Sequence, residues 1–380
     1  MELIDLKKQL QSFRPDIDLA IGRVLDHGQF ILGPEVRELE QSLAKYANVS
    51  HCVSCANGTD ALVLALRALE IGSGDAVIVP CFTFAATAEA VCNVGATPIF
   101  VDVDPDTFNV DPDSISKAVS VAYSEKLTPR AVIAVDLFGL PADYTLLSAE
   151  AKLHDLHLIA DAAQSFGASA NGRPVGCMAD ITTTSFFPAK PLGCYGDGGA
   201  IFTDHPELAE KIMSLRVHGK GADKYDNVRV GFNSRLDTIQ AAILLVKLSR
   251  LESEIKIKNE VAQKYNDYLS LHLSGELVTP SVCKNSVSAW AQFTVRCNPS
   301  HRFRVTQYLK DKGIPTAIYY PTPLHRLSAY CQCPTVEGSL RNAENLAESV
   351  FSLPIHAYLT GEQIDSVVRA LCVYDWTHVP

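Results

Sequence analysis

The stretch "AVIVPCFTFAATAEAVCNVGATPIFVDV", residues 76–103, begins and ends with short, continuous apolar runs. The runs at 76–80 and 97–103 do not alternate with polar residues, which is typical of strands that are buried on both faces. The segment between them, "AATAEAVCNVG", has helical spacing. A strand, a helix and a second strand in this order predict two parallel strands joined by a helical crossover.

The same alternation continues on both sides of this unit. The helical pattern "TDALVLALRAL" precedes it, and the apolar runs 131–138 and 156–163 follow it with the helical segment "YTLLSAEAKLHD" between them. Repeated units of this kind predict an α/β fold, in which helices cover a mostly parallel sheet.

The sequence changes character after a long helical pattern that starts at Arg235. Beyond it come a strand-like segment, "AWAQFTVRC", and two helical segments, "HRFRVTQYLKDKG" and "GEQIDSVVRAL". We therefore expect a large α/β domain over residues 1–250 and a smaller C-terminal α+β domain over 251–380, since 380 residues suffice for one large core and a smaller one.

Composition argues against several classes of partner. The net charge is −10 and no basic run occurs, so we expect neither nucleic acid nor an anionic membrane to bind. The opening segment "MELIDLKKQL" lacks the apolar core of a signal peptide, and the longest apolar stretches fall short of the ~20 residues that span a bilayer. These features predict a soluble, cytoplasmic protein.

The eleven cysteines are expected to be free thiols, as in a reducing compartment. Cys52 and Cys55 form a CxxC, and Cys331 and Cys333 a CxC, but no second CxxC or His pair completes a zinc ligand set. No metal site is predicted from this spacing.

A second metal-like motif, "DVDPDTFNVDPD" at residues 102–113, resembles a calcium loop. Thr107 stands where such a loop needs glycine, and Asp113 stands where it needs glutamate. The Asp-Pro pairs favour turns at this point instead.

Two chemically useful side chains are expected at the same sheet edge. Asp161 ends the predicted strand "LHLIA", and Lys190 follows the next strand-like run, "ITTTSFF". Open α/β sheets bind ligands at the carboxyl ends of their strands. A plain ion pair is the simpler explanation for an acid and an amine at such an edge.

Two further features argue for a ligand. Gly58 and Thr59 begin a helix, where free amides and the helix dipole favour a phosphate, although an ordinary N-cap would also explain them. Phe84 follows a strand end and would either join the core or stack on a flat ring.

Pyridoxal 5′-phosphate would use all of these groups. It needs a lysine for its Schiff base, an acid facing the pyridinium nitrogen, a phosphate cradle and a platform for the ring. Lys190 would move the proton between the amino donor and the cofactor. The glycines of "PLGCYGDGGA" would let the backbone pass close to the cofactor.

Across nearly its whole length the sequence resembles the DegT/DnrJ/EryC1/StrS sugar aminotransferases, which are fold-type I pyridoxal-phosphate enzymes. The motifs that carry the resemblance are "HGQFILGPEV" (27–36), "NGTDAL" (57–62), "FTFAATAE" (82–89), "DAAQSFGA" (161–168), "SFFPAKPLGCYGDGGA" (185–200), "VGFNSRLDTIQAAIL" (230–244), "YYPTPLH" (319–325) and "SLPIH" (352–356).

The resemblance implies a role for each matching residue. Lys190 would form the Schiff base, and Asp161 would face the pyridinium nitrogen. The other implied cofactor contacts are Gln164 beside the phenolic oxygen, Phe84 on the ring, and Gly58, Thr59 and Ser185 at the phosphate. Asn233 would reach the phosphate of a second subunit, which implies a homodimer with shared active sites.

The resemblance also implies the reaction. L-glutamate would be the amino donor and a nucleotide-linked keto sugar the acceptor; relatives with histidine in place of the lysine are dehydratases, so Lys190 favours amino transfer. The nearest branch acts on UDP-2-acetamido-2-deoxy-3-oxo sugars for lipopolysaccharide. The implied substrate contacts are Gly28, Phe30, Arg235, Tyr319 and Tyr320.

Three positions depart from the glucuronate-type pattern. Phe30, Ala189 and Tyr319 stand where tyrosine, serine and histidine are expected, and each change alters a polar contact. We therefore favour the neutral 3-keto-N-acetylglucosamine over its uronate, although Arg235 would suit a carboxylate.

Three alternatives stay open. A thymidine-linked 3- or 4-keto-hexose aminotransferase would share every cofactor residue. A non-catalytic regulator would be expected to have lost Lys190 or Asp161, and a cysteine desulfurase-like lyase would need Cys194 as a catalytic thiol. His218 and His325 occupy family motif positions, where a structural role is as reasonable as a catalytic one.

Overall fold

The structure is a computed structural model that describes residues 1–223, 225–336 and 340–377. Its centre is a seven-stranded sheet with the strand order β1-β9-β8-β5-β4-β2-β3. The strands are β1 (His51–Cys55), β2 (Asp75–Pro80), β3 (Thr97–Val101), β4 (Thr128–Val135), β5 (His157–Asp161), β8 (Ile181–Ser185) and β9 (Gly199–Thr203). Neighbouring strands from β3 to β8 pair in parallel, while β9 pairs antiparallel with both β8 and β1. The predicted α/β class is thus confirmed.

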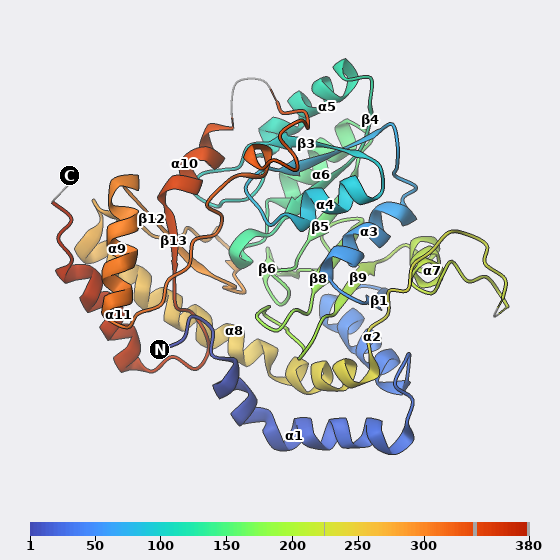
Figure 1. Cartoon of the computed structure of the whole chain (residues 1–380), viewed down its shortest axis with the longest axis horizontal. Helices are drawn as coiled ribbons and strands as arrows, with labels where there is room; N and C mark the ends of the chain where they lie inside the picture. Colours follow the sequence, from blue (N-terminus) through green and yellow to red (C-terminus); the bar gives the residue numbers. More distant parts are fainter. Residues whose placement is uncertain (224, 337–339, 378–380) are drawn as a thin grey trace.

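Helices lie on both sides of this sheet (Figure 1). They are α2 (Pro34–Ala47), α3 (Gly58–Ala68), α4 (Ala86–Asn93), α5 (Ile115–Ser124), α6 (Tyr144–Leu153) and α7 (Pro206–Leu215). The first helix, α1 (Leu6–His27), packs against the long helix α8 (Thr238–Leu273). Local chemistry fixes where several of them begin. Asn57 caps α3 by accepting a hydrogen bond from the Asp60 amide at 2.8 Å, and Pro34 opens α2 at a position that needs no amide donor.

The long helix α8 (Thr238–Leu273) joins two hydrophobic cores. Leu251 and Ile255 belong to the large core around the sheet, whereas the helix from Val261 onward belongs to a second core. The other elements of the second core are β10 (Leu277–Val278), β12 (Phe293–Cys297), α9 (Pro299–Asp311), β13 (Val350–Leu353) and α11 (Gly361–Val373). The boundary at 250/251 falls inside α8 and stays a prediction.

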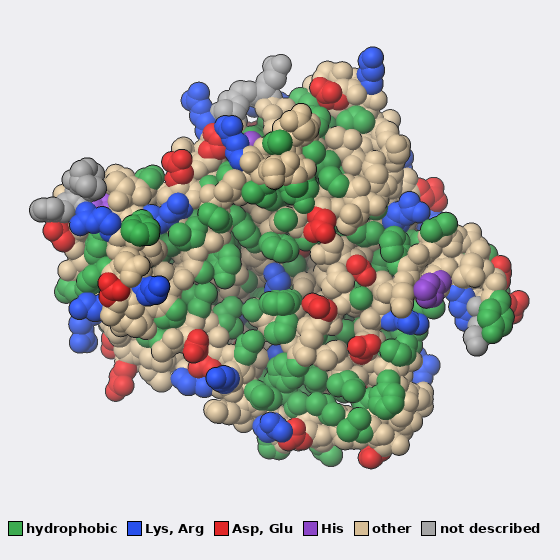
Figure 2. Space-filling view, viewed as in Figure 1, with side chains coloured by type: hydrophobic (Ala, Val, Ile, Leu, Met, Phe, Trp, Pro, Cys, Tyr) green, Lys and Arg blue, Asp and Glu red, His purple; other side chains and the backbone are tan. Residues whose placement is uncertain are grey.

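Short elements complete the described chain. A small sheet joins β11 (Ser286–Val287) with β6 (Ser169–Ala170) and β7 (Arg173–Pro174), and the 3₁₀ turns are η1 (Pro112–Ser114), η2 (Leu137–Gly139) and η3 (Leu324–Arg326). Within the described ranges, no helix is both long enough and apolar enough to cross a bilayer. Figure 2 shows basic and acidic side chains interspersed on one face of the molecule.

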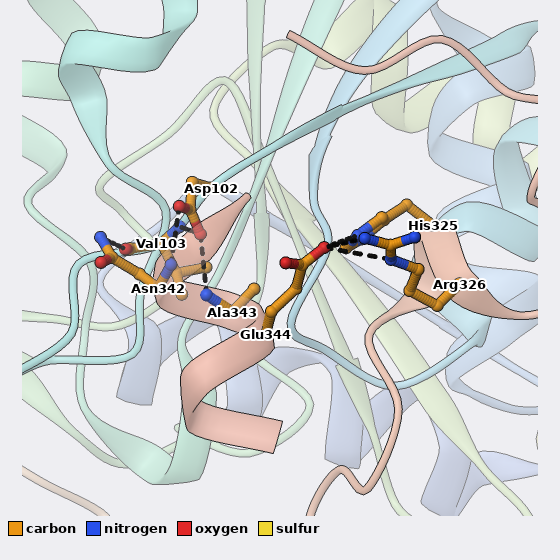
Figure 3. Close-up of polar contacts among 7 residues, drawn as sticks. All are labelled: Asp102, Val103, His325, Arg326, Asn342, Ala343 and Glu344. Atoms are coloured by element: carbon orange, nitrogen blue, oxygen red, sulfur yellow. Dashed lines mark hydrogen bonds and ion pairs between the residues drawn. The ribbon is translucent and has the colours of Figure 1, made fainter. Parts of the chain in front are cut away.

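The helix α10 (Arg341–Ser349) binds to the carboxyl end of β3 through its N-terminus. The carboxylate of Asp102 accepts hydrogen bonds from the amides of Asn342 and Ala343 at 3.0 and 2.9 Å. Farther along the helix, Glu344 accepts bonds from His325 and Arg326, as Figure 3 shows. The His325 side chain, 9% exposed, thus has a structural partner, and the C-terminal segment is attached to the large core.

Replacing Asp102 by alanine removes both bonds to the N-terminus of α10. Because a lost helix cap costs about 1 kcal/mol, we expect Asp102→Ala to lower the free energy of unfolding by about that amount in urea titrations. The exposed ion pair of Asp18 with Arg14 on α1 provides a control, since Asp18→Ala should cost less than about 0.5 kcal/mol. Equal losses in the two variants would contradict the capping role.

Candidate active site

Asp161 is a buried carboxylate at the carboxyl end of β5. It accepts a hydrogen bond from the amide of Ala163 at 3.1 Å and one from the hydroxyl of Thr87 at 3.4 Å. Burial raises the pKa of Asp161, while the bond from Ala163 and the charge of Lys190 act in the opposite direction. An ionised carboxylate accepts about four hydrogen bonds, so this one has capacity for a further cationic donor.

Lys190 lies in the turn that follows β8, close enough to Asp161 for their charges to interact. Its amide donates to the carbonyl of Phe187 at 2.8 Å, and the amide of Cys194 donates to Phe186 at 2.8 Å. Burial lowers the pKa of Lys190, and the charge of Asp161 opposes that shift. The structure therefore brings together the acid and the amine that the sequence predicted at this edge.

The glycines after Lys190 are also needed for packing within the chain itself. A Cβ on Gly193 would lie 2.4 Å from the carbonyl oxygen of Pro188, and one on Gly199 would lie 2.4 Å from that of Asn57. The close approaches are thus between segments of the chain itself. The glycines allow the turn around Lys190 to fold tightly against its neighbours.

The N-terminus of α3 packs closely against the end of β8, where the sequence predicts a phosphate cradle. A Cβ on Gly58 would lie 2.7 Å from the Cβ of Ser185, so only glycine allows this approach. Gly58, Thr59 and Ser185 are partly exposed there, and the Ser185 hydroxyl accepts a bond from the Phe187 amide at 3.2 Å. The free amides and dipole of the helix favour an anion at this place.

An exposed aromatic ring completes the site. Phe84 is 57% exposed although it follows a fully buried strand, and its ring centroid lies 6.3 Å from that of Tyr320. The side-chain amide of Gln164 donates to the Tyr320 hydroxyl at 3.2 Å and accepts from the amide of Phe138 at 2.9 Å. Gln164, Phe84 and Tyr320 therefore lie beside one another, as a ring platform and its neighbours require.

These residues fit pyridoxal phosphate. The acceptor capacity of Asp161 suits the protonated ring nitrogen, and the cradle at Gly58 suits the phosphate. The exposed face of Phe84 suits the flat ring, and the buried amine of Lys190 suits the aldehyde. The four chemical requirements of this cofactor are met by four groups that come from separate strand ends.

The residues expected to bind the substrate are less clearly grouped around Lys190 than the residues expected to bind the cofactor. Gly28 ends α1 in a left-handed conformation, with its amide bonded to Val24, which is a structural role. The carbonyl of Phe30 accepts from the amide of Thr238, which places Phe30 near the segment that carries Arg235. Among the described residues, no hydrogen bond or ion pair joins Phe30 or Arg235 to Lys190.

Tyr319 and Tyr320 both pack against the large core, and the hydroxyl of Tyr320 also accepts a hydrogen bond from Gln164. Asn233 is exposed and pairs only with Val217, through an isolated bridge, in the described part of the chain. Its reach into a second subunit stays a prediction.

Thr87 is a site residue that sequence analysis missed. It lies in the first turn of α4 and donates to Asp161, so it orients the carboxylate. The motif "FTFAATAE" contains it, but only the fold shows that the start of α4 lies over the end of β5.

Comparisons with known proteins agree with this site. Residues 12–372 match the DegT/DnrJ/EryC1/StrS aminotransferase family. The chain is 46% identical to the UDP-2-acetamido-2-deoxy-3-oxo-D-glucuronate aminotransferase of Pseudomonas aeruginosa, over 98% of this chain and 99% of that one. It is 42% identical to the UDP-N-acetyl-3-dehydro-alpha-D-glucosamine 3-aminotransferase of Acidithiobacillus ferrooxidans, over 97% and 96%. A crystal structure of a DegT/DnrJ/EryC1/StrS aminotransferase from Brucella abortus superimposes with a TM-score of 0.95 at 45% identity, covering 98% of both chains.

Replacing Gly58 by alanine tests the phosphate cradle. Because the new Cβ would collide with Ser185, we expect Gly58→Ala to weaken the binding of pyridoxal phosphate by roughly tenfold or more in absorbance titrations. Gly275→Ala is the matched control, since a Cβ there meets nothing within 4 Å and should leave the affinity unchanged. Equal affinities in the two variants would place the phosphate elsewhere.

Proposed function

The chain belongs to the DegT/DnrJ/EryC1/StrS aminotransferase family, and from this membership we propose which amino transfer it performs. It is an aminotransferase of nucleotide-linked keto sugars, and pyridoxal phosphate is its cofactor. The proposed reaction moves the amino group of L-glutamate to the 3-keto carbon of a UDP-linked 2-acetamido-2-deoxy sugar. The observation that carries it is the partly buried Lys190 beside the buried Asp161, next to the predicted phosphate cradle.

Each residue of the site has a distinct task in this reaction. The cofactor, when bound, withdraws electrons from the donor carbon. Asp161 would hold the ring nitrogen protonated, and Thr87 orients that carboxylate through its hydrogen bond. With the cofactor bound, Lys190 would take up the proton from the α-carbon of L-glutamate, and burial, which lowers the pKa of Lys190, would favour the neutral amine that this role needs. Phe84 supports the ring, so that the reacting carbon stays within reach of Lys190.

The neutral sugar is our first choice of acceptor. In the resemblance to the glucuronate-type enzymes, Phe30, Ala189 and Tyr319 replace tyrosine, serine and histidine. Phe30 and Ala189 offer no side-chain hydrogen bond, and sites that recognise a carboxylate depend on such bonds. The relative that acts on the neutral 3-dehydro sugar, at 42% identity, supports this choice.

The uronate is the second candidate, and a specific observation favours it. The glucuronate aminotransferase has the higher identity, 46%, and Arg235 is half-buried on the segment that pairs with the Phe30 segment. A guanidinium at this place would bind a carboxylate through two parallel hydrogen bonds. A thymidine-linked 3- or 4-keto hexose would be the acceptor if both UDP sugars fail.

The remaining parts of the proposal concern assembly and pathway. We place the enzyme in the cytoplasm and in the synthesis of an amino sugar for lipopolysaccharide. Two protomers would share their active sites, with the exposed Asn233 of each reaching the phosphate of the other. The resemblance of this sequence to the DegT/DnrJ/EryC1/StrS family supports this assembly.

A half-reaction experiment tests the acceptor. The cofactor is first converted to its amine form with L-glutamate, and each UDP-3-keto sugar is then added while the visible absorbance is followed. We expect the neutral sugar to restore the absorbance. Recovery with the uronate alone would show our first choice to be wrong, and recovery with neither would favour the thymidine-linked acceptor.

The variant Arg235→Gln sharpens this comparison. If the neutral sugar is the substrate, the variant should change kcat/KM by less than about threefold, because no sugar carboxylate is present to lose a partner. If the uronate is the substrate, kcat/KM should fall by roughly a hundredfold, since two charge-assisted hydrogen bonds disappear. Steady-state kinetics with both sugars distinguishes the two cases.

A further inference from the structure

A buried ion pair lies behind the phosphate cradle and has no part in the reaction described above. Arg216, at the end of α7, donates through Nη1 to the carboxylate of Glu40 at 2.5 Å. Both side chains are largely buried, with exposed fractions of 9% and 15%. The Nε of Arg216 is buried without a hydrogen-bond partner among the described residues. An arrangement that leaves a buried donor unpaired is costly, so its geometry needs an explanation.

The pair holds the strand that leads into the cradle. Nη1 of Arg216 also donates to the carbonyl of Ser54 at 2.7 Å, while Glu40 accepts from the amide and the hydroxyl of Ser54 at 2.9 and 2.7 Å. Ser54 is fully buried in β1, and the chain continues from it through Asn57 to Gly58. One ion pair therefore fixes the end of β1 from two sides.

The same arginine holds a second segment that matters for the site. Its carbonyl accepts from the amide of Ser234 at 2.9 Å, and the hydroxyl of Ser234 accepts from the amide of Ala56 at 3.2 Å. The neighbour of Arg216, Val217, pairs with Asn233. The chain between these two residues projects from the body of the molecule beyond α7 (Figure 1). Arg216 thus stands between the cradle and the base of the projecting segment.

We propose that Arg216, through its ion pair with Glu40, is a positioning residue for the cofactor phosphate. It aligns the first turn of α3, with Gly58 and Thr59, and holds Asn233 in a fixed relation to that turn. The part that concerns Asn233 rests on the proposed function, in which this residue binds the phosphate in a second subunit. The part that concerns Gly58 depends on the cofactor alone.

Two ligands that differ only in the phosphate test this role. Dissociation constants of pyridoxal phosphate and of pyridoxal are measured by absorbance titration for the unaltered protein, Glu40→Gln and Arg216→Lys. Glu40→Gln keeps the shape and the acceptor oxygen but removes the charge. We expect both variants to bind pyridoxal phosphate roughly tenfold more weakly and to bind pyridoxal within about threefold of the unaltered protein.

A purely structural ion pair would give a different result. It would weaken the two ligands equally or lower only the melting temperature, and either outcome overturns the proposal. Lys211→Met is the matched control, because Lys211 on α7 forms an exposed ion pair with Glu70 that does not touch β1. It should leave both constants unchanged.

The proposal about the sugar acceptor and the proposal about Arg216 are tested by separate measurements. Since these titrations contain no sugar, an error about the acceptor leaves their result intact. Should Arg216→Lys not fold, as judged by circular dichroism, Glu40→Gln decides alone. If the unaltered protein binds pyridoxal as tightly as pyridoxal phosphate, no phosphate site exists to be positioned and the proposal is wrong.

Discussion

The structure depends on keeping one carboxylate and one amine buried beside each other at the edge of a parallel sheet. Water would normally stabilise both charges, and burial shifts the pKa of Asp161 upward and that of Lys190 downward. Neither shift is cancelled by the other residue, because the two side chains interact without forming a close ion pair within 4 Å among the described residues. A cationic ring nitrogen would stabilise the carboxylate of Asp161, and an aldehyde would react with the amine of Lys190; one cofactor would supply both groups.

The helix α8 supports this arrangement through its buried lysines. Lys247 donates to the carbonyl of Gly193, in the turn that carries Lys190, and Lys258 donates to the carbonyl of Ala289 in the chain that leads to the second core. Burial lowers the pKa of both lysines to about 8. Glu254, between them on the helix, opposes these shifts and accepts bonds from Gln9 and Tyr358. The turn around Lys190 is therefore held by the same helix that joins the two cores.

The sequence predicted the parts of the molecule in which local pattern and chemistry coincide. The runs that became β2, β4 and β5 each contain a continuous apolar segment, at 76–79, 131–135 and 158–160. Asp161 follows the third of these segments directly, and Lys190 follows the strand-like run that became β8. It missed β1, "HCVSC", and β9, which begins in a glycine-rich stretch, because each gains its strand character from antiparallel pairing with the other. Thr87, Arg216 and Glu40 were missed for a related reason. Their roles arise from contacts between residues far apart in the chain, such as the ion pair of Glu40 with Arg216. The sequence immediately around these two residues has no motif that marks them.

The difference between cofactor and substrate residues has a physical cause. The cofactor groups lie on strand ends and helix starts that are fixed by the core, so their positions follow from the fold. Phe30 is exposed and Arg235 is half-buried, and both lie on segments outside the sheet. Substitutions on these segments would change a predicted substrate contact without disturbing the core, whereas substitutions at Gly58 or Asp161 would disturb the predicted cofactor site. One cofactor frame can therefore serve different sugars, because the predicted substrate contacts lie on segments outside the sheet that fixes the cofactor residues.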